Sequence, residues 1–182
     1  KGLLGPQGIG GLYISDGLVL NTLMEGGTGS NSENLFQPDF MPDLLESGTL
    51  NTPAIVGLRH GIEFINNFGL ENLNLYKHNL IKRLYEGIKG IKGAKLYSKE
   101  EVDKNSGIIA MNFEGVDSTE VSYMLDKVYG IATRAGLHCA PLAHKALGTF
   151  EAGVVRLSVG CFNTFEEIDF VLNALKKISS NI

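Results

Sequence analysis

Residues 134–145, RAGLHCAPLAHK, bring together side chain types that can do chemistry. Cys139 follows His138 directly, and Arg134 lies five residues before the cysteine. The thiolate is the nucleophilic form of cysteine, and nearby positive charge favours it. Three interpretations of Cys139 are open on these residues: a small buried side chain, a metal ligand, or a reactive sulfur.

A metal site is the weakest of the three. His138 and Cys139 are adjacent, neighbouring residues rarely bind the same ion, and no second Cys/His pair completes a set of four with His144. We therefore expect no metal. The segment 135–153 contains several Gly and Pro residues and little periodicity, so we expect Cys139 on a loop, where a thiol is accessible. Cys161 directly follows an apolar strand and is better explained by packing.

Three basic residues carry similar alternatives. Arg134 and Arg156 each end or interrupt an apolar stretch, either as strand-edge residues in solvent or as guanidinium groups that face a carboxylate. Lys1 stands before the glycine-rich stretch 2–11, either as a solvated lysine or with its side chain in a pocket. That stretch lacks the Gly-Lys-Ser/Thr of a P-loop, and Tyr13 stands where GxGxxG requires its third glycine. It is a tight turn or a place where the backbone approaches a ligand.

The elements that must position these residues differ between the two ends of the chain. Asp16-Gly17 is a hairpin signal between two apolar stretches, and a long Gly- and Asn-rich connection follows. Apolar periodicity then predicts helices, the first with Thr52 as N-cap and the last capped by Thr164 and Glu167. The sequence predicts strands over 8–15, 17–24, 94–98, 107–113, 131–134 and 154–158, and helices over 53–69, 71–89, 117–130 and from 164 onward.

Composition limits the function classes. The 182 residues carry a net charge of −4 with no cluster of Lys and Arg, which argues against nucleic acid. Apolar runs fall short of the roughly 18 residues of a membrane span, and we see no signal segment, so we expect a cytoplasmic protein. The second part reads as a compact α+β unit with helices on one side of a small sheet. The first 50 residues lack helices to cover their strands, so we expect the sheet to belong to a larger protein.

Four motifs occur together in one family. KGLLGPQGIGGLYI resembles the segment that starts at the cofactor-binding lysine of class V aminotransferase-like enzymes. RAGLHCAPLAH resembles the cysteine motif of the cysteine desulfurases, in the short-loop group (group II) that includes selenocysteine lyase-like members. VRLSVGCFNTFEEID is similar to their substrate-arginine motif, and ESGTLNT to their threonine-bearing loop. The order and spacing cover nearly the whole chain and resemble the C-terminal half of such an enzyme.

The resemblance implies an α/β fold: the C-terminal part of a PLP-dependent transferase of fold type I. Residues 1–52 would be the end strands and active-site loops of the large, PLP-binding domain. Residues 53–182 would be a helical connection and the small C-terminal α+β domain. The implied cofactor is pyridoxal 5′-phosphate (PLP), attached at Lys1, with Thr49 reaching the phosphate of the neighbouring subunit in a homodimer.

The resemblance also implies roles in a reaction that turns L-cysteine into L-alanine. Arg156 would hold the substrate carboxylate, and Cys139 would take the sulfur as a persulfide. Arg134 and His138 would bind near the substrate and favour the thiolate. The sulfur would pass to an acceptor protein for iron–sulfur cluster or thio-cofactor assembly. Alternatives are a selenocysteine lyase, another class V enzyme, or, for the isolated chain, an inactive dimerisation or interaction domain.

Overall fold

The computed structural model describes residues 1–27, 29–99 and 105–182, in two compact units. The first unit is Lys1–Gly69 and the second is Leu70–Ile182. Each unit has its own internal packing, and the two are described separately. Among the described residues, no helix combines the length and the apolar character that crossing a membrane requires.

The regular structure of the first unit lies at its C-terminal end. A 3-10 turn, η1 (Asp43–Leu45), precedes the long helix α1 (Thr52–Phe68). The side chain of Asn51 caps α1 by accepting a hydrogen bond from the backbone of Ala54 at 3.2 Å. The predicted N-cap, Thr52, is therefore wrong by one residue, because the Asn51 amide oxygen reaches the free N–H group first.

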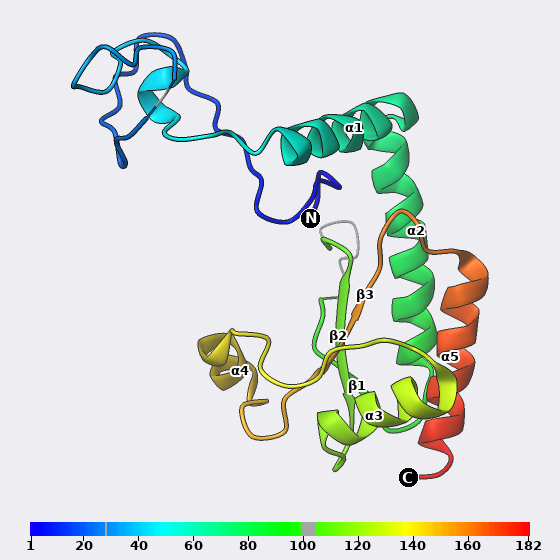
Figure 1. Cartoon of the computed structure of the whole chain (residues 1–182). Coiled ribbons are helices and arrows are strands. Elements are labelled where there is room, and N and C mark those ends of the chain that lie inside the picture. The colour runs from blue at the N-terminus through cyan, green and yellow to red at the C-terminus, as the bar shows by residue number, and fades with distance from the viewer. Residues whose placement is uncertain (28, 100–104) are drawn as a thin grey trace. The chain divides into compact units, whose positions relative to one another are not determined.

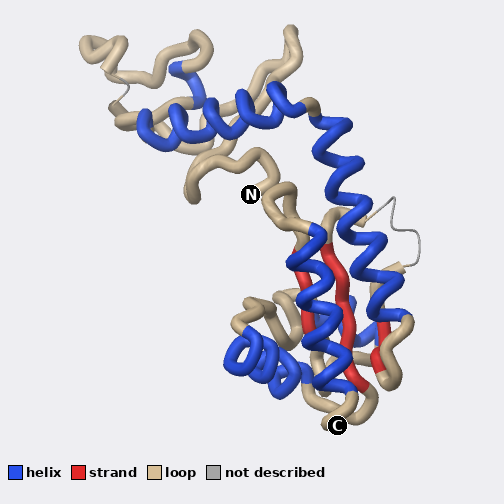
Figure 2. The backbone as a smooth tube through the Cα atoms, turned by 90° about the vertical axis from the view of Figure 1, so that its right-hand side faces the viewer, coloured by secondary structure: helices blue, strands red, loops and turns tan. Residues whose placement is uncertain are grey.

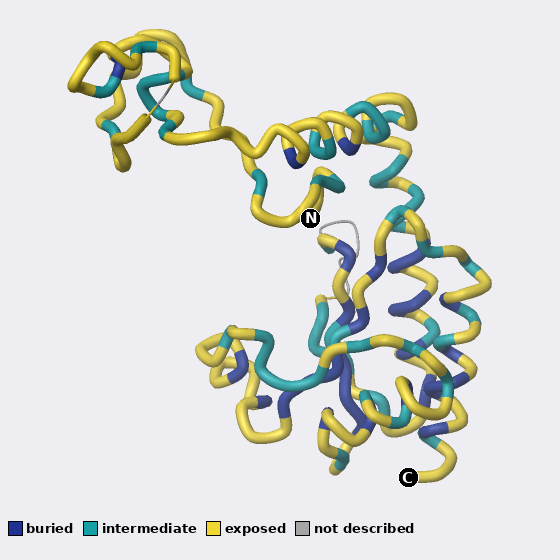
Figure 3. The backbone as a smooth tube through the Cα atoms, in the orientation of Figure 1, coloured by how far each residue is buried: buried dark blue, intermediate teal, exposed yellow. Residues whose placement is uncertain are grey.

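The hairpin predicted over residues 8–24 is only partly present. Its turn is confirmed, because Leu18 N–H donates to the Ser15 carbonyl at 3.3 Å around Asp16-Gly17. The two strands are wrong: the described residues of the first unit contain no strand. A two-stranded ribbon without a covering layer is marginal in water, and this stretch is mostly exposed (Figure 3). Its exposed apolar side chains include those of Leu12, Tyr13, Val19 and Leu23.

The second unit is an antiparallel sheet covered by helices (Figure 1). The strand order is β1-β2-β3, and Met111 at the centre of β2 pairs with Leu96 on one side and Val155 on the other. This architecture confirms the predicted α+β unit. In chain order the elements are α2 (Leu70–Lys89), β1 (Ala94–Leu96), β2 (Ile108–Phe113), α3 (Ser118–Tyr129), α4 (Pro141–Leu147), β3 (Val155–Ser158) and α5 (Phe165–Ser179).

One face of the sheet forms the core. Side chains alternate between the two faces of a strand, and the buried positions of β2 and β3 face the helices. Helices α2 and α5 lie side by side over this face (Figure 2). Arg156 lies between two core residues of β3, so its side chain points to the opposite face. The fully or nearly buried residues of this core include Leu80, Leu84 and Ile88 of α2, Ile109, Met111 and Phe113 of β2, Val155 and Leu157 of β3, and Leu172 and Leu175 of α5.

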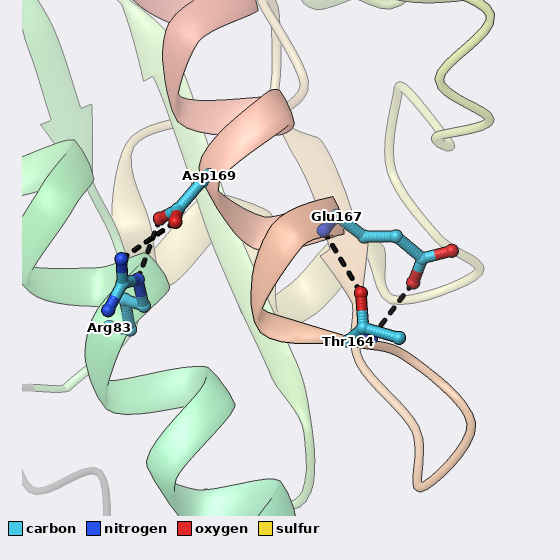
Figure 4. A network of polar contacts seen from close by, with 4 residues as sticks. All are labelled: Arg83, Thr164, Glu167 and Asp169. Carbon is cyan, nitrogen blue, oxygen red and sulfur yellow. Dashed lines mark hydrogen bonds and ion pairs between the residues drawn. The ribbon is translucent and has the colours of Figure 1, made fainter.

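Polar contacts hold α5 at its start and against α2 (Figure 4). The predicted capping box is confirmed, with Thr164 and Glu167 bonded reciprocally through side chain and backbone. Arg83 of α2 donates to both carboxylate oxygens of Asp169, at 2.6 and 2.7 Å. The hydrogen bond from Arg83 lowers the pKa of the Asp169 carboxyl below its ordinary value. Both side chains are exposed, so the pair orients the helices more than it stabilises them.

Two further predictions fail near the candidate site. Residues 131–134 do not form a strand, since only Arg134 makes a bridge, to Arg156. The pairing continues instead toward the loop, where Gly136 and Val154 exchange two backbone hydrogen bonds of 3.2 Å. Helix α4 was not predicted, because seven residues give too little periodicity to recognise, although Pro141 is a favoured residue in its first turn.

Candidate active site

The two predicted site arginines lie opposite each other, Arg156 in β3 and Arg134 in an isolated antiparallel bridge to it. Arg156 N–H donates to the Arg134 carbonyl at 2.8 Å, and Arg134 N–H donates back at 3.4 Å. Directly opposed residues in an antiparallel pair place their side chains on the same face. Both guanidinium groups therefore project from the face away from the core. Like charges so placed repel each other, which favours an anion between or beside them.

Arg156 has an unsatisfied donor on that face. Its side chain is half-buried, and its Nε atom is buried with no hydrogen-bond partner among the residues that the structure describes. Buried donors are nearly always paired in folded proteins, so an orphaned guanidinium nitrogen calls for a ligand. A carboxylate suits it best, because two parallel N–H···O bonds fit the guanidinium fork.

Cys139 lies at the tip of the loop before α4. Its thiol is exposed, which argues against the packing interpretation. The Arg134 Nη2 atom lies 3.5 Å from the Cys139 sulfur. His138 and Cys139 both have left-handed backbone angles, with φ of 54° and 60°. Such angles cost non-glycine residues about 1–2 kcal/mol each, and they concentrate at functional sites.

His138 supports the loop rather than adding positive charge to it. Its Nε2 atom lies 3.1 Å from the Val154 carbonyl oxygen, which can only accept, so Nε2 carries the proton. Burial lowers the pKa of His138 below its ordinary value of 6.5, and the positive charges of Arg156 and Arg134 lower it further. His138 is therefore neutral at pH 7, and the cation beside the Cys139 sulfur is Arg134.

Lys1 and Thr49 belong to the first unit. Lys1 is exposed and starts a turn that Leu4 N–H closes by donating to its carbonyl at 3.0 Å. This turn packs on α1 at Gly61, where an added Cβ atom would lie 2.3 Å from the Leu3 carbonyl oxygen. Glycine at position 61 thus makes room for the turn that presents Lys1. Thr49 is exposed, just before the N-terminus of α1.

The described residues meet the chemical requirements of PLP in part. An exposed lysine amine on a fixed turn can carry the aldehyde, and an exposed threonine hydroxyl can donate to a phosphate. In the second unit, the orphaned Arg156 Nε suits a carboxylate. Within the described part of the chain, no group of three or more His, Cys, Asp or Glu residues has a geometry that could hold a metal ion.

The sequence did not identify two polar residues behind the loop. His144 of α4 is 5% exposed, and its Nδ1 atom lies 2.8 Å from the hydroxyl oxygen of Thr149. Thr149 is 2% exposed and follows Gly148, which ends α4 in a left-handed conformation. Gly148 is typical of a residue that ends a helix, and it could have indicated that Thr149 follows a helix end. This signal is useful only once α4 has been recognised.

A cavity of about 540 Å³ lies elsewhere in the second unit. It is formed by residues 130–132, the end of β3 and the first turns of α5. Neither Cys139 nor either site arginine lines it. The cavity therefore does not mark the candidate active site of this unit. The opposed arginines and the exposed Cys139 thiol mark it instead, because their side chains can bind an anion and act as a nucleophile.

Comparisons with known proteins agree on one family. The sequence matches the family "Aminotransferase class-V" over residues 1–171. A probable cysteine desulfurase of Methanothermobacter thermautotrophicus is 33% identical over 184 residues, covering 98% of this chain and 46% of the relative. A cysteine desulfurase of Escherichia coli is 32% identical over 182 residues, covering 97% of this chain and 43% of the relative.

Solved structures give the same picture. The apo structure of a cysteine desulfurase from Thermococcus onnurineus matches with a TM-score of 0.83 at 29% identity, covering 100% of this chain and 46% of that one. The E. coli cysteine desulfurase CsdA matches with a TM-score of 0.76, over 89% of this chain and 39% of that one; at 23% identity this likeness concerns the fold alone. The chain spans about half the length of the curated relatives it matches.

Proposed function

This chain belongs to the class V aminotransferase family, and on that premise we propose that it is the C-terminal portion of a PLP-dependent cysteine desulfurase. The observation that carries the proposal is the exposed thiol of Cys139 beside Arg134, on the loop that adjoins the opposed arginines. Other reactions of this family do not need a reactive cysteine at that place. The relatives named cysteine desulfurase support the same activity.

Lys1 and Thr49 are the residues of this chain that would hold PLP. The amine of Lys1 attaches the cofactor and moves a proton to and from the substrate Cα. The Thr49 hydroxyl would donate to the phosphate of the cofactor in the neighbouring subunit of a homodimer. When bound, PLP supplies an electron-withdrawing ring that weakens the bonds at the substrate Cα. The remaining cofactor contacts come from outside these residues.

Arg156 orients the substrate. Its guanidinium group, with the Nε atom otherwise unpaired, takes the α-carboxylate of L-cysteine in two parallel hydrogen bonds. This contact fixes the rotation of the amino acid and hence which Cα bond reacts. Arg134 on the neighbouring segment adds positive charge to the same face.

Cys139 receives the sulfur. Its thiolate attacks the substrate Sγ atom, so an S–S bond forms while the Cβ–Sγ bond breaks. The electron pair of the broken bond passes to Cβ, which takes up a proton as L-alanine forms. The product on the enzyme is a persulfide, which an acceptor protein removes for iron–sulfur cluster or thio-cofactor assembly. We expect the enzyme in a reducing cytoplasm, where a cysteine thiol stays free of disulfides.

The discriminating experiment replaces Cys139 in the complete protein. We expect Cys139→Ala to lose release of L-alanine from L-cysteine. If the protein is instead a selenocysteine lyase, the same variant keeps its activity on L-selenocysteine, because selenium leaves without attack by a protein thiol. A Cys139→Ala variant that retains both activities would contradict the persulfide role. Cys161→Ala is the matched control and keeps both activities.

A further inference from the structure

Two buried polar residues, His144 and Thr149, lie behind the loop that carries Cys139. Neither has a role in the proposed sulfur chemistry. We infer that His144 and Thr149 are positioning residues, which hold His138 and through it keep Cys139 exposed and against Arg134. We call His138, His144 and Thr149 the histidine clamp. The inference builds on the proposed role of Cys139 and concerns how that thiol is presented.

The tip needs support because its backbone is strained. His138 and Cys139 are consecutive non-glycine residues in the left-handed region. Such a conformation persists only where surrounding contacts fix it. The contacts on Cys139 itself are few, because its side chain is exposed and its partner is the Arg134 guanidinium. A backbone hydrogen bond from Ala140 N–H to the Leu137 carbonyl, at 2.9 Å, closes the turn, and the side chain of His138 ties this turn to the rest of the unit.

Two contacts fix the ring of His138. Its Nε2–H donates to the Val154 carbonyl, at the base of the loop where Gly136 pairs with Val154. The ring also packs on that of His144, with centroids 5.8 Å apart and planes inclined by 39°. The Nδ1 atom is buried with no partner among the described residues, so it contributes no further anchor. Without the His144 support, the His138 ring keeps one hydrogen bond, to the Val154 carbonyl, beside the backbone bond that closes the turn.

Thr149 fixes His144 in turn. The Thr149 hydroxyl and backbone N–H both donate to the His144 carbonyl, at 3.5 and 2.9 Å. The Thr149 hydroxyl oxygen and His144 Nδ1 also lie 2.8 Å apart and form a hydrogen bond in which either group can donate. His138 is the Nε2–H tautomer, because the Val154 carbonyl can only accept. Buried polar pairs of this kind are costly to break, which makes the support rigid.

The charged and titratable groups that act on His138 are Arg156, Arg134 and His144. Burial lowers the pKa of His138, and the two positive arginines lower it further. The His138 ring is therefore neutral at pH 7. This arrangement leaves the Arg134 guanidinium as the positive group at the Cys139 sulfur.

Alkylation by iodoacetamide at pH 7.5 tests the inference. Peptide mass spectrometry measures the alkylation rates of Cys139 and Cys161 separately, and the ratio of the two rates is compared between variants. Thr149→Val keeps the shape and removes the hydroxyl, and we expect the Cys139/Cys161 rate ratio to fall about two- to fivefold. Thr149→Ser restores the hydroxyl and the ratio. Ser122→Ala, which removes a 2.8 Å hydroxyl contact with Thr133 outside the clamp, leaves the ratio unchanged. A folded Thr149→Val protein with the wild-type ratio overturns the inference.

A measurement on the wild-type chain does not depend on how the variants fold. Imidazole ¹H–¹⁵N NMR spectra at pH 7 should show Nε2–H for His138, the proton that the Val154 carbonyl accepts. An Nδ1–H tautomer at His138 overturns the clamp. Neither experiment needs PLP or cysteine turnover, so failure of the desulfurase proposal and failure of the clamp are separate outcomes.

Discussion

The Arg134 guanidinium lies 3.5 Å from the sulfur of Cys139, and no carboxylate contacts that guanidinium among the described residues. The sulfur therefore has a cation as its nearest charged neighbour. The contact is solvent-exposed, so its effect on reactivity is modest.

Arg134→Gln should slow the alkylation of Cys139 at pH 7.5 by about two- to fivefold, because an exposed charge contact contributes up to about 1 kcal/mol. Arg134→Lys, which keeps the charge, should recover part of the rate. The effect should shrink in 1 M salt, which screens exposed charges. An unchanged alkylation rate of Cys139 in Arg134→Gln would show that Arg134 does not activate the thiol.

Arg156→Lys in the complete protein should raise KM for L-cysteine about tenfold to a hundredfold, since the fork that matches a carboxylate is lost while the charge stays. The control is Arg83→Lys, which alters an exposed arginine on α2 that bonds Asp169. Steady-state kinetics on both variants distinguish substrate binding from general loss of stability. Equal KM values in the two variants would contradict a carboxylate role for Arg156.

Gly61→Ala should destabilise the turn that presents Lys1. The new Cβ atom would lie 2.3 Å from the Leu3 carbonyl oxygen, so backbone must move, at about 1–3 kcal/mol. Gly90→Ala is the control, because the nearest atom to its added Cβ is 3.6 Å away. Thermal unfolding measures the stability of each variant. The rate at which the Lys1 side chain is acetylated measures whether the turn still presents it as in the wild type. Identical behaviour of the two variants would show that the turn does not pack on Gly61.

The sequence predicted the second unit well, and in the first unit it predicted the helix α1 but not the structure of residues 8–24. The helices α2, α3 and α5 and strands β1, β2 and β3 were recognised because each carries a periodic apolar face that its own neighbours bury. Residues 8–24 carry strand-like apolar stretches, but a strand needs a partner, and the described residues of their unit supply none. A local pattern cannot report which other segments will cover it.

The candidate site was predictable by residue type but not by geometry. The loop position of Cys139 follows from the Gly and Pro residues around it, and the structure confirms it. The opposition of Arg134 and Arg156 depends on strand register, which the sequence does not encode locally. The burial of His144 depends on a seven-residue helix that is too short to show a period.

The lowered pKa of His138 predicts a loss of stability at mildly acid pH. A folded histidine with a pKa below 6.5 binds fewer protons than the unfolded chain does, so stability is intact above 6.5 and falls as pH drops from 6.5 toward the folded value. Urea unfolding at pH 7.5 and at successively lower pH values measures this slope. His138→Gln should flatten the part of the slope just below 6.5, and a variant with the wild-type slope would contradict the assignment.

The most direct test of the central claim is the fate of sulfur in the complete protein. After incubation with PLP and one equivalent of L-cysteine, peptide mass spectrometry should find one added sulfur atom on the peptide that contains Cys139, with one equivalent of L-alanine released. The peptide containing Cys161 should carry none. Release of L-alanine with no sulfur on Cys139, or sulfur found on Cys161 instead, would contradict the claim that Cys139 is the persulfide carrier.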